Sequence, residues 1–325
     1  MMAVSLAARA DDGSRINILE ENDSLYFTSD RHYTQGLRIS YLGPDVGGES
    51  GWNMPFDALH DLLPIFTPKG DVSRRYALEI GQSIFTPENL KLNPPDPRDR
   101  PYGAWTYAGL SFLEETGRRT LENVELQAGV VGPAALGEVT QNDFHEFIKV
   151  HRAMGWHDQI QNEPGILISY ERKRRLLLLG DDGLGLDIVP EIDATVGNVF
   201  TYGEIGTMLR FGKNIGADYG PVRVRPAQSG SDYFNADHLD GDFGFYGFIG
   251  VAGRAVGRNI FLDGNTFRTS RNVDKEILVG DLQGGIALFW SSAFRLDFTV
   301  GTRSPEFVGQ RHPDLLGSAA LSFSW

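Results

Sequence analysis

The sequence predicts an all-β protein, an antiparallel transmembrane β-barrel of about twelve strands with a short helix in an extracellular loop. Apolar and polar residues alternate along many segments of roughly ten residues, as barrel strands require. No run of about twenty apolar residues occurs, so a helical membrane span is excluded. The last strand, 318–325, is apolar at every second position and ends on Trp325. Such a strand would promote aggregation in a soluble domain, whereas lipid covers its apolar face in a barrel.

The composition agrees with a barrel and excludes some partners. The chain has 325 residues, no cysteine and 39 glycines, which suit turns and bends. Its mean hydropathy of -0.24 is typical of a soluble protein. A barrel can have the same value, because only half of each strand is apolar. The net charge of -13 and the lack of a basic stripe argue against nucleic acid as a partner. We expect no obligate protein partner.

The first residues carry a weak processing signal. Ala8-Arg9-Ala10 has the small-x-small form of a signal-peptidase site and precedes two aspartates. We expect residues 1–10 to be a signal-peptide remnant or a disordered start. Residues 11–325 are then expected to form one outer-membrane barrel domain.

The alternation of apolar and polar residues predicts where the strands begin. They are expected to begin near residues 15, 34, 74, 104, 119, 165, 186, 202, 242, 276, 293 and 315. Charged residues on the alternate faces should fill the lumen and make a poor pore; they include Arg38, Glu125, Asp193, Arg295 and Asp297. A β-sandwich shows the same alternation, so the pattern alone leaves that fold open. The aromatic end and the segment lengths favour the barrel.

Two segments depart from the strand pattern. Residues 138–152 show helical periodicity in an outer loop, with Phe144, Phe147, Ile148 and His151 on one stripe. We expect this apolar stripe to pack on the barrel wall or on lipid. Residues 52–63 predict a second short helix, which the strand order assigns to the periplasmic side.

The loop after the first strand is rich in hard oxygen ligands. Four carboxylates between Glu20 and Asp30 accompany Asn22, and such groups suit Ca²⁺. The spacing is not that of an EF-hand, and from the chemistry alone a solvated acidic hairpin loop is the favoured interpretation.

Other polar residues have two interpretations each. Arg100 is suited to binding an anionic group such as phosphate, or to a rim ion pair. Gln141 and His145 lie one helical turn apart, where a histidine beside an apolar surface can act as a general base on an acyl ester. A structural histidine is the alternative, and His151 and His157 compete for the role.

Together these motifs resemble the outer-membrane lipid A 3'-O-deacylase family over residues 17 to 325. The matching segments are Asn22–Ser24, Thr28–Gly36, Asp99–Tyr102, Gly132–Ala134, Gln141–Asn142, His145–Glu146, Gly155–Trp156 and Asn162–Gly165. Two positions depart from the family pattern: Gln35 replaces an asparagine, and Asp99 replaces a basic residue.

The resemblance implies a Ca²⁺-dependent esterase that removes the 3'-acyloxyacyl chain from lipid A of lipopolysaccharide in the outer membrane. By this resemblance His145, Gln141, Asn22 and Thr34 are catalytic, Asp23 and Asn22 hold the metal, and Arg100 binds substrate. His145 would take a proton from the attacking water; no Gly-x-Ser-x-Gly elbow is present for a serine nucleophile. The alternatives are an outer-membrane phospholipase and a non-enzymatic barrel with a degenerate site.

Overall fold

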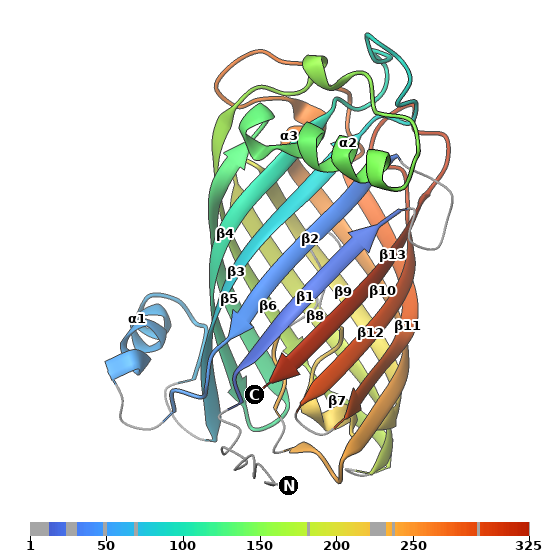
Figure 1. The fold of residues 1–325 in the computed structure, drawn as a ribbon. Helices are drawn as coiled ribbons and strands as arrows, with labels where there is room; N and C mark the ends of the chain where they lie inside the picture. Colours follow the sequence, from blue (N-terminus) through green and yellow to red (C-terminus); the bar gives the residue numbers. More distant parts are fainter. Residues whose placement is uncertain are drawn as a thin grey trace, which may run out of the picture.

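The computed structural model describes residues 13–23, 31–47, 51–67, 71–180, 183–221, 232–235, 238–290 and 293–324. Its antiparallel sheet has thirteen strands and closes where β6 (Glu163–Arg174) pairs with β8 (Leu184–Gly197) (Figure 1). Strand β7 (Leu176–Gly180) continues β6 past a break at Arg175 and pairs with β8 as well. The ring therefore has twelve positions, which confirms the predicted fold.

Each predicted strand start lies within two residues of an observed one, because a period of two is unambiguous when one face meets lipid. In the last strand, for example, Ser318 and Ser322 are buried while Leu321 is exposed on the outer face. The remaining strands are β1 (Arg15–Asn22), β2 (His32–Leu42), β3 (Val72–Thr86), β4 (Gly103–Thr116), β5 (Thr120–Val131), β9 (Phe200–Lys213), β10 (Phe243–Asn259), β11 (Leu278–Trp290), β12 (Phe294–Arg303) and β13 (Asp314–Ser324).

The two ends of the cylinder differ. One end carries the long connections, including the loop with helix α2 (Gly137–Phe147), whereas at the other end β4 returns to β5 through residues 117–119 (Figure 1). Outer-membrane barrels have long extracellular loops and short periplasmic turns. The α2 end is therefore the outer end, and the opposite one is the periplasmic end.

No helix in the described ranges is long and apolar enough to cross a membrane. Three predictions fall on positions outside those ranges: the processing signal in residues 1–10, the terminal Trp325, and the part of the acidic loop in residues 24–30.

Buried ion pairs fill the middle of the lumen. Arg254 contacts Glu204 at 2.8 Å and Asp281 at 2.6 Å, and the Arg295 Nε lies 2.9 Å from Asp297. These charges come from the same strand or from neighbouring strands and satisfy one another in a low-dielectric interior. The expected charged lumen is therefore present.

The connection between β9 and β10 adds a plug that alternation does not predict. Its short helix η4 (Ile215–Ala217) leads to Tyr219, whose hydroxyl donates to Glu115 Oε1 at 2.7 Å. Tyr233 donates to Glu115 Oε2 at 2.6 Å, and Asp232 pairs with Arg38 of the wall. Residues 214–221 and 232–235 thus fill the periplasmic half of the lumen.

The outer mouth is filled by an apolar cluster. The helix α3 (Ile260–Asp263), between β10 and β11, points Phe261 inward, where it stacks on Phe85 with ring centroids 4.0 Å apart. Trp105, Tyr107 and Tyr202 belong to the same cluster.

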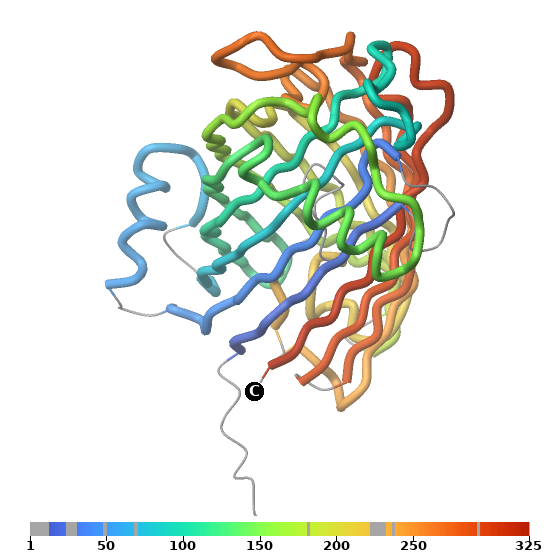
Figure 2. Tube along the Cα trace, turned by 45° about the horizontal axis from the view of Figure 1, so that its top comes forward, coloured from blue at the N-terminus to red at the C-terminus, as the bar shows by residue number. Residues whose placement is uncertain are grey.

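The second predicted helix is confirmed. Helix α1 (Met54–Leu62) follows the short helix η1 (Gly51–Asn53) in the connection from β2 to β3. It stands outside the wall near the periplasmic end, where Phe56 packs on Phe112 and Tyr76 (Figures 1 and 2). Asp57 pairs with Arg74 at 2.8 Å and ties the helix to β3.

Candidate active site

Helix α2 lies against the outside of the barrel wall, not in its mouth (Figures 1 and 2). The turn η2 (Pro133–Ala135) leads into it, and the carbonyl of Ala135 accepts hydrogen bonds from Gln82 Nε2 at 2.6 Å and Thr106 Oγ1 at 2.8 Å. A Cβ added at Gly137 would lie 2.5 Å from the Cβ of Ala104 on β4. Only glycine permits this close approach, so the first turn of α2 is fixed against the wall.

The face of α2 that meets the wall is polar, so the structure excludes the wall as the partner of the apolar stripe and leaves lipid, the other expected partner. Phe144 and Ile148 are each 45% exposed and Phe147 is 82% exposed. The buried residues are Gly137, Gln141, Asn142 and His145. An amphipathic helix beside a lipid-facing wall has apolar surroundings on its outer side, so its polar face turns to the protein.

The helix also ends earlier than the predicted residue 152. Lys149 adopts a left-handed backbone with φ of 61°, and Asn142 Oδ1 accepts a hydrogen bond from the returning chain at Ala153 N, 2.8 Å away. His151 consequently leaves the apolar stripe and lies in an exposed loop.

A cavity of about 440 Å³ lies between α2 and the strands β1 and β2. Four of the residues expected to be catalytic, which are far apart in sequence, line it together: Asn22, Thr34, Gln141 and His145. The rest of its lining is Gln35, Glu88, Asn89, Leu90, Lys91, Phe144, Ile148, Val150, His151 and Arg152. The cavity opens beside the exposed apolar face of α2 on the lipid side of the barrel.

A β-bulge brings Thr34 into this cavity. The pairing of β2 with β3 shifts register between Tyr33 and Gln35, so Thr34 is the extra residue. Its hydroxyl lies 2.7 Å from that of Thr86 on β3. Asn22, at the end of β1, is paired with Gln35 and shares this outer face.

Two hydrogen bonds orient the polar residues of α2. His145 Nδ1 lies 2.7 Å from the carbonyl oxygen of His151, and Trp156 Nε1 donates to Gln141 Oε1 at 2.8 Å. Trp156, in the turn η3 (Trp156–Asp158), is held by Tyr102 with ring centroids 4.9 Å apart. Both catalytic candidates on the helix are therefore preorganised.

Asp23 follows Asn22 directly and is buried, with Oδ2 accepting a hydrogen bond from the backbone N–H of Arg31. Carboxylate and amide oxygens are the ligands that Ca²⁺ takes, so this donor set fits the ion. In the described ranges no three acidic or histidine side chains gather in a metal-binding group. Asn22 and Asp23 would need backbone carbonyls or water to complete the coordination.

Arg100 does not line the cavity. Its side chain is fully buried, with Nη1 3.1 Å from Glu306 Oε2 and the guanidinium 4.9 Å from the Phe85 ring centroid. Burial raises the pKa of Glu306, but the cations of Arg303 and Arg100 outweigh it and lower that pKa below its usual value. The geometry is that of a buried ion pair, and a substrate-binding role for Arg100 stays a prediction.

Sequence reasoning missed the cations that do line the cavity, Lys91 and Arg152. Both are exposed, and both come from loops with no periodicity to mark them. Glu88, also on the lining, pairs with Arg31 at 2.8 Å. Asp99, the departure from the family pattern, accepts hydrogen bonds from the backbone N–H groups of Glu88 and Arg100, each at 2.7 Å, and so shapes this loop.

Comparison with known proteins finds a matching family model and solved structures of similar fold. A family model described as "Outer membrane protein LpxR" matches residues 1–325. The solved structure of LpxR from Salmonella typhimurium is similar with a TM-score of 0.73 at 21% identity, covering 96% of this chain and 100% of that one. The β domain of the Bordetella autotransporter BrkA matches with a TM-score of 0.43 at 9% identity, covering 96% of this chain and 97% of that one. None of the curated proteins matches this sequence.

Proposed function

Because the chain belongs to the LpxR family of outer membrane proteins, we propose that it is an esterase that removes an ester-linked acyl chain from lipid A. The proposed position is the 3'-acyloxyacyl group, and the proposed activity depends on Ca²⁺. The observation that carries the proposal is the cavity between α2 and the barrel wall, which Asn22, Thr34, Gln141 and His145 line together.

The location of the cavity suits a lipid substrate. It lies on the outer side of the wall near the outer end, beside the exposed side chains of Phe144 and Ile148. An acyl chain in the outer leaflet reaches such a site from the membrane without entering the lumen. Lys91 and Arg152 on the lining provide positive charge for the phosphates of the lipid A headgroup.

In the proposed reaction His145 acts as general base. Its Nε2 takes a proton from a water molecule whose oxygen attacks the acyl carbonyl carbon. The ester C–O bond then breaks, and the proton passes from His145 to the departing hydroxyl oxygen of the lipid. Gln141 and Thr34 position water and substrate within the cavity. Asn22 and Asp23 would hold Ca²⁺, which when bound supplies positive charge to stabilise the oxyanion.

Mass spectrometry of lipid A tests the proposal directly. The detergent-purified full chain, shown to be folded by its heat-modifiable migration, is incubated with lipid A in Ca²⁺ and in EDTA. Loss of one acyl chain only with Ca²⁺ is expected. Acyl release from glycerophospholipid alone would make the protein a phospholipase, and no release from either lipid would leave a non-enzymatic barrel; each outcome contradicts the proposal.

A further inference from the structure

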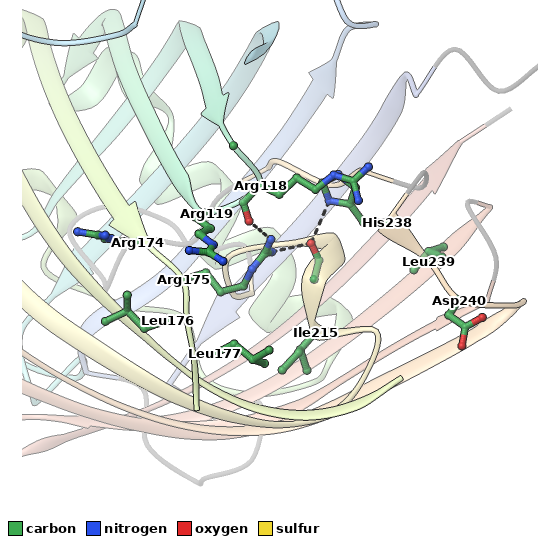
Figure 3. A pocket seen from close by; sticks show the side chains of 12 residues that line it. Arg118, Arg119, Arg174, Arg175, Leu176, Leu177, Ile215, His238, Leu239 and Asp240 are labelled. Carbon is green, nitrogen blue, oxygen red and sulfur yellow. Dashed lines mark hydrogen bonds between the residues drawn. The ribbon is translucent and has the colours of Figure 1, made fainter. Parts of the chain in front are cut away.

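A second cavity, of about 690 Å³, lies at the periplasmic end, far from the candidate active site. Three parts of the chain line it: the turn between β4 and β5, the junction of β6 and β7, and the connection between β9 and β10 (Figure 3). Its charged or titratable lining residues are Arg118, Arg119, Arg174, Arg175, His238 and Asp240. The catalytic proposal uses none of them.

This cavity is strongly basic in an acidic protein. Four arginines line it against one carboxylate, Asp240, although the chain has a net charge of -13. Arg118, Arg119 and Arg174 are exposed, and in the described ranges their side chains form no ion pair. Several lumen arginines, in contrast, face carboxylates: Arg254 contacts both Glu204 and Asp281. Guanidinium groups without a carboxylate partner that line one cavity are suited to an anion.

Arg175 builds the frame of the cavity. Its Nη1 donates to the Gly216 carbonyl at 2.5 Å and its Nη2 donates to the carbonyl of Arg118, as Figure 3 shows. The same guanidinium lies 5.0 Å from the ring centroid of Tyr219 in the plug. The turn, the strand break and the plug are therefore joined by one side chain, and the cavity is a built feature.

The turn residue Arg118 is not explained by turn chemistry. Gly117 and Arg118 have φ of 57° and 56°, and Arg119 N donates to Thr116 O at 3.2 Å. A hairpin turn with two positive φ values favours glycine or asparagine at both central positions. Arginine at the second position costs some backbone strain there, so turn geometry does not account for this residue.

Exposed leucines adjoin the basic cavity. Leu176, Leu177, Leu178 and Leu179 form most of β7 and are 38% to 68% exposed. Figure 3 shows Leu176 and Leu177 on the strand next to Arg175. In the described sheet β7 pairs with β8 alone, so its other edge is open. Exposed leucines beside a group of arginines match an amphipathic anion.

We propose that this cavity binds the phosphate headgroup of an anionic glycerophospholipid from the periplasmic leaflet. Arg118, Arg119 and Arg174 bind the phosphate, and the leucines of β7 contact the acyl chains. The inference goes beyond the proposed activity, since it concerns the other end of the barrel and the other leaflet.

Lipid binding to the full chain in detergent tests this site. Native mass spectrometry compares phosphatidylglycerol with zwitterionic phosphatidylcholine of the same chains, and soluble glycerol 3-phosphate serves as competitor. The test variant is Arg118→Asn/Arg119→Gln/Arg174→Gln, whose asparagine suits the turn better than arginine and so protects folding. The control is Arg98→Gln/Arg268→Gln/Arg311→Gln, which removes three exposed arginines from the outer end.

We expect the wild-type chain to prefer phosphatidylglycerol and the test variant to bind it on the order of a hundredfold more weakly, about fivefold for each arginine. The control variant should bind like the wild type. Equal binding of both lipids, or equal affinity of the test variant and the wild type, would overturn the proposal. Glycerol 3-phosphate competing as well as the lipid would assign the cavity to free phosphates and overturn the lipid assignment.

A second variant separates binding of the headgroup from binding of the acyl chains. Leu177→Asn/Leu179→Asn should weaken binding of phosphatidylglycerol and leave that of glycerol 3-phosphate unchanged. Unchanged lipid affinity in this variant would contradict the role of β7.

Discussion

The Nδ1 atom of His145 lies 2.7 Å from the carbonyl oxygen of His151. A carbonyl oxygen only accepts hydrogen bonds, so Nδ1 carries the proton and the lone pair lies on Nε2. The helix end at Lys149 produces this contact, because the left-handed turn brings His151 back over its own helix. One backbone feature thus selects the tautomer that a general base requires.

Replacing His145 with asparagine should lower acyl release from lipid A by about a hundredfold to ten-thousandfold, the usual contribution of a general base. The barrel should remain folded, since His145 lies on a loop helix outside the wall. His157→Asn is the matched control: that side chain is 59% exposed and lies outside the cavity, so its loss should leave turnover intact. Full turnover by the His145 variant would exclude the proposed mechanism.

Asp23→Asn should raise the Ca²⁺ concentration for half-maximal activity about tenfold or more, because it removes the charged ligand of the proposed site. A Ca²⁺ titration of acyl release measures the shift. Asp96→Asn is the control, an exposed outer-loop carboxylate whose pKa is lowered to about 2 by hydrogen bonds from Arg98. If Asp23→Asn and the wild type had the same half-activating concentration, Asp23 would not be a metal ligand.

Trp156→Phe should reduce kcat about tenfold and leave KM unchanged. The indole N–H that holds Gln141 at 2.8 Å is lost while the packing on Tyr102 is largely kept, so Gln141 moves from its productive position. Steady-state kinetics on lipid A separate the two parameters. Trp52→Phe, on the exposed surface near α1, should change neither; an equal fall in that variant would point to general loss of structure.

Lys91→Ala/Arg152→Ala should raise KM for phosphorylated lipid A on the order of twentyfold, about fivefold for each cation, with kcat unchanged. Arg268→Ala, an exposed arginine that does not line the cavity, should have no effect. With dephosphorylated lipid A, the double variant and the wild type should have the same KM. A KM that rises equally on both substrates would show that these cations do not recognise phosphate.

Arg38→Met should destabilise the barrel by about 3 to 5 kcal/mol, because it leaves Asp232 and Glu79 buried without their cation. Unfolding by guanidinium in lipid vesicles measures the free energy. Adding Asp232→Asn should restore part of the loss, since one of the two stranded charges is removed. If Arg38→Met were as stable as the wild type, the plug would not depend on this ion pair.

The wall was predictable from sequence, whereas the plug and the orientation of α2 were not. Strand β12 illustrates the first case: lipid on one side and charges on the other impose a strict alternation from Phe294 to Val300. The plug carries no such period, and its Asp232 meets Arg38 across 194 positions of sequence. Such distant pairing leaves no local pattern.

The candidate site was predicted in its members but not in its geometry. Asn22, Thr34, Gln141 and His145 follow from the family resemblance, and the structure brings them together. Trp156, which holds Gln141, lies in one of the segments that match the family, but its role depends on a tertiary hydrogen bond. For Arg100 the family resemblance implied substrate binding while the chemistry alone favoured an ion pair, and the structure shows an ion pair with Glu306 from the far end of the chain.

The described residues that line the cavity beside α2 all fall between 22 and 152, within the first five strands and their loops. Neighbouring hairpins bring these residues together, so assembling the site costs little loop-closure entropy beyond that of forming the hairpins. The second half of the chain closes the cylinder and supplies none of this lining. Substitutions in β8 to β13 therefore reach the cavity only indirectly, through contacts such as that of Glu306 with Arg100.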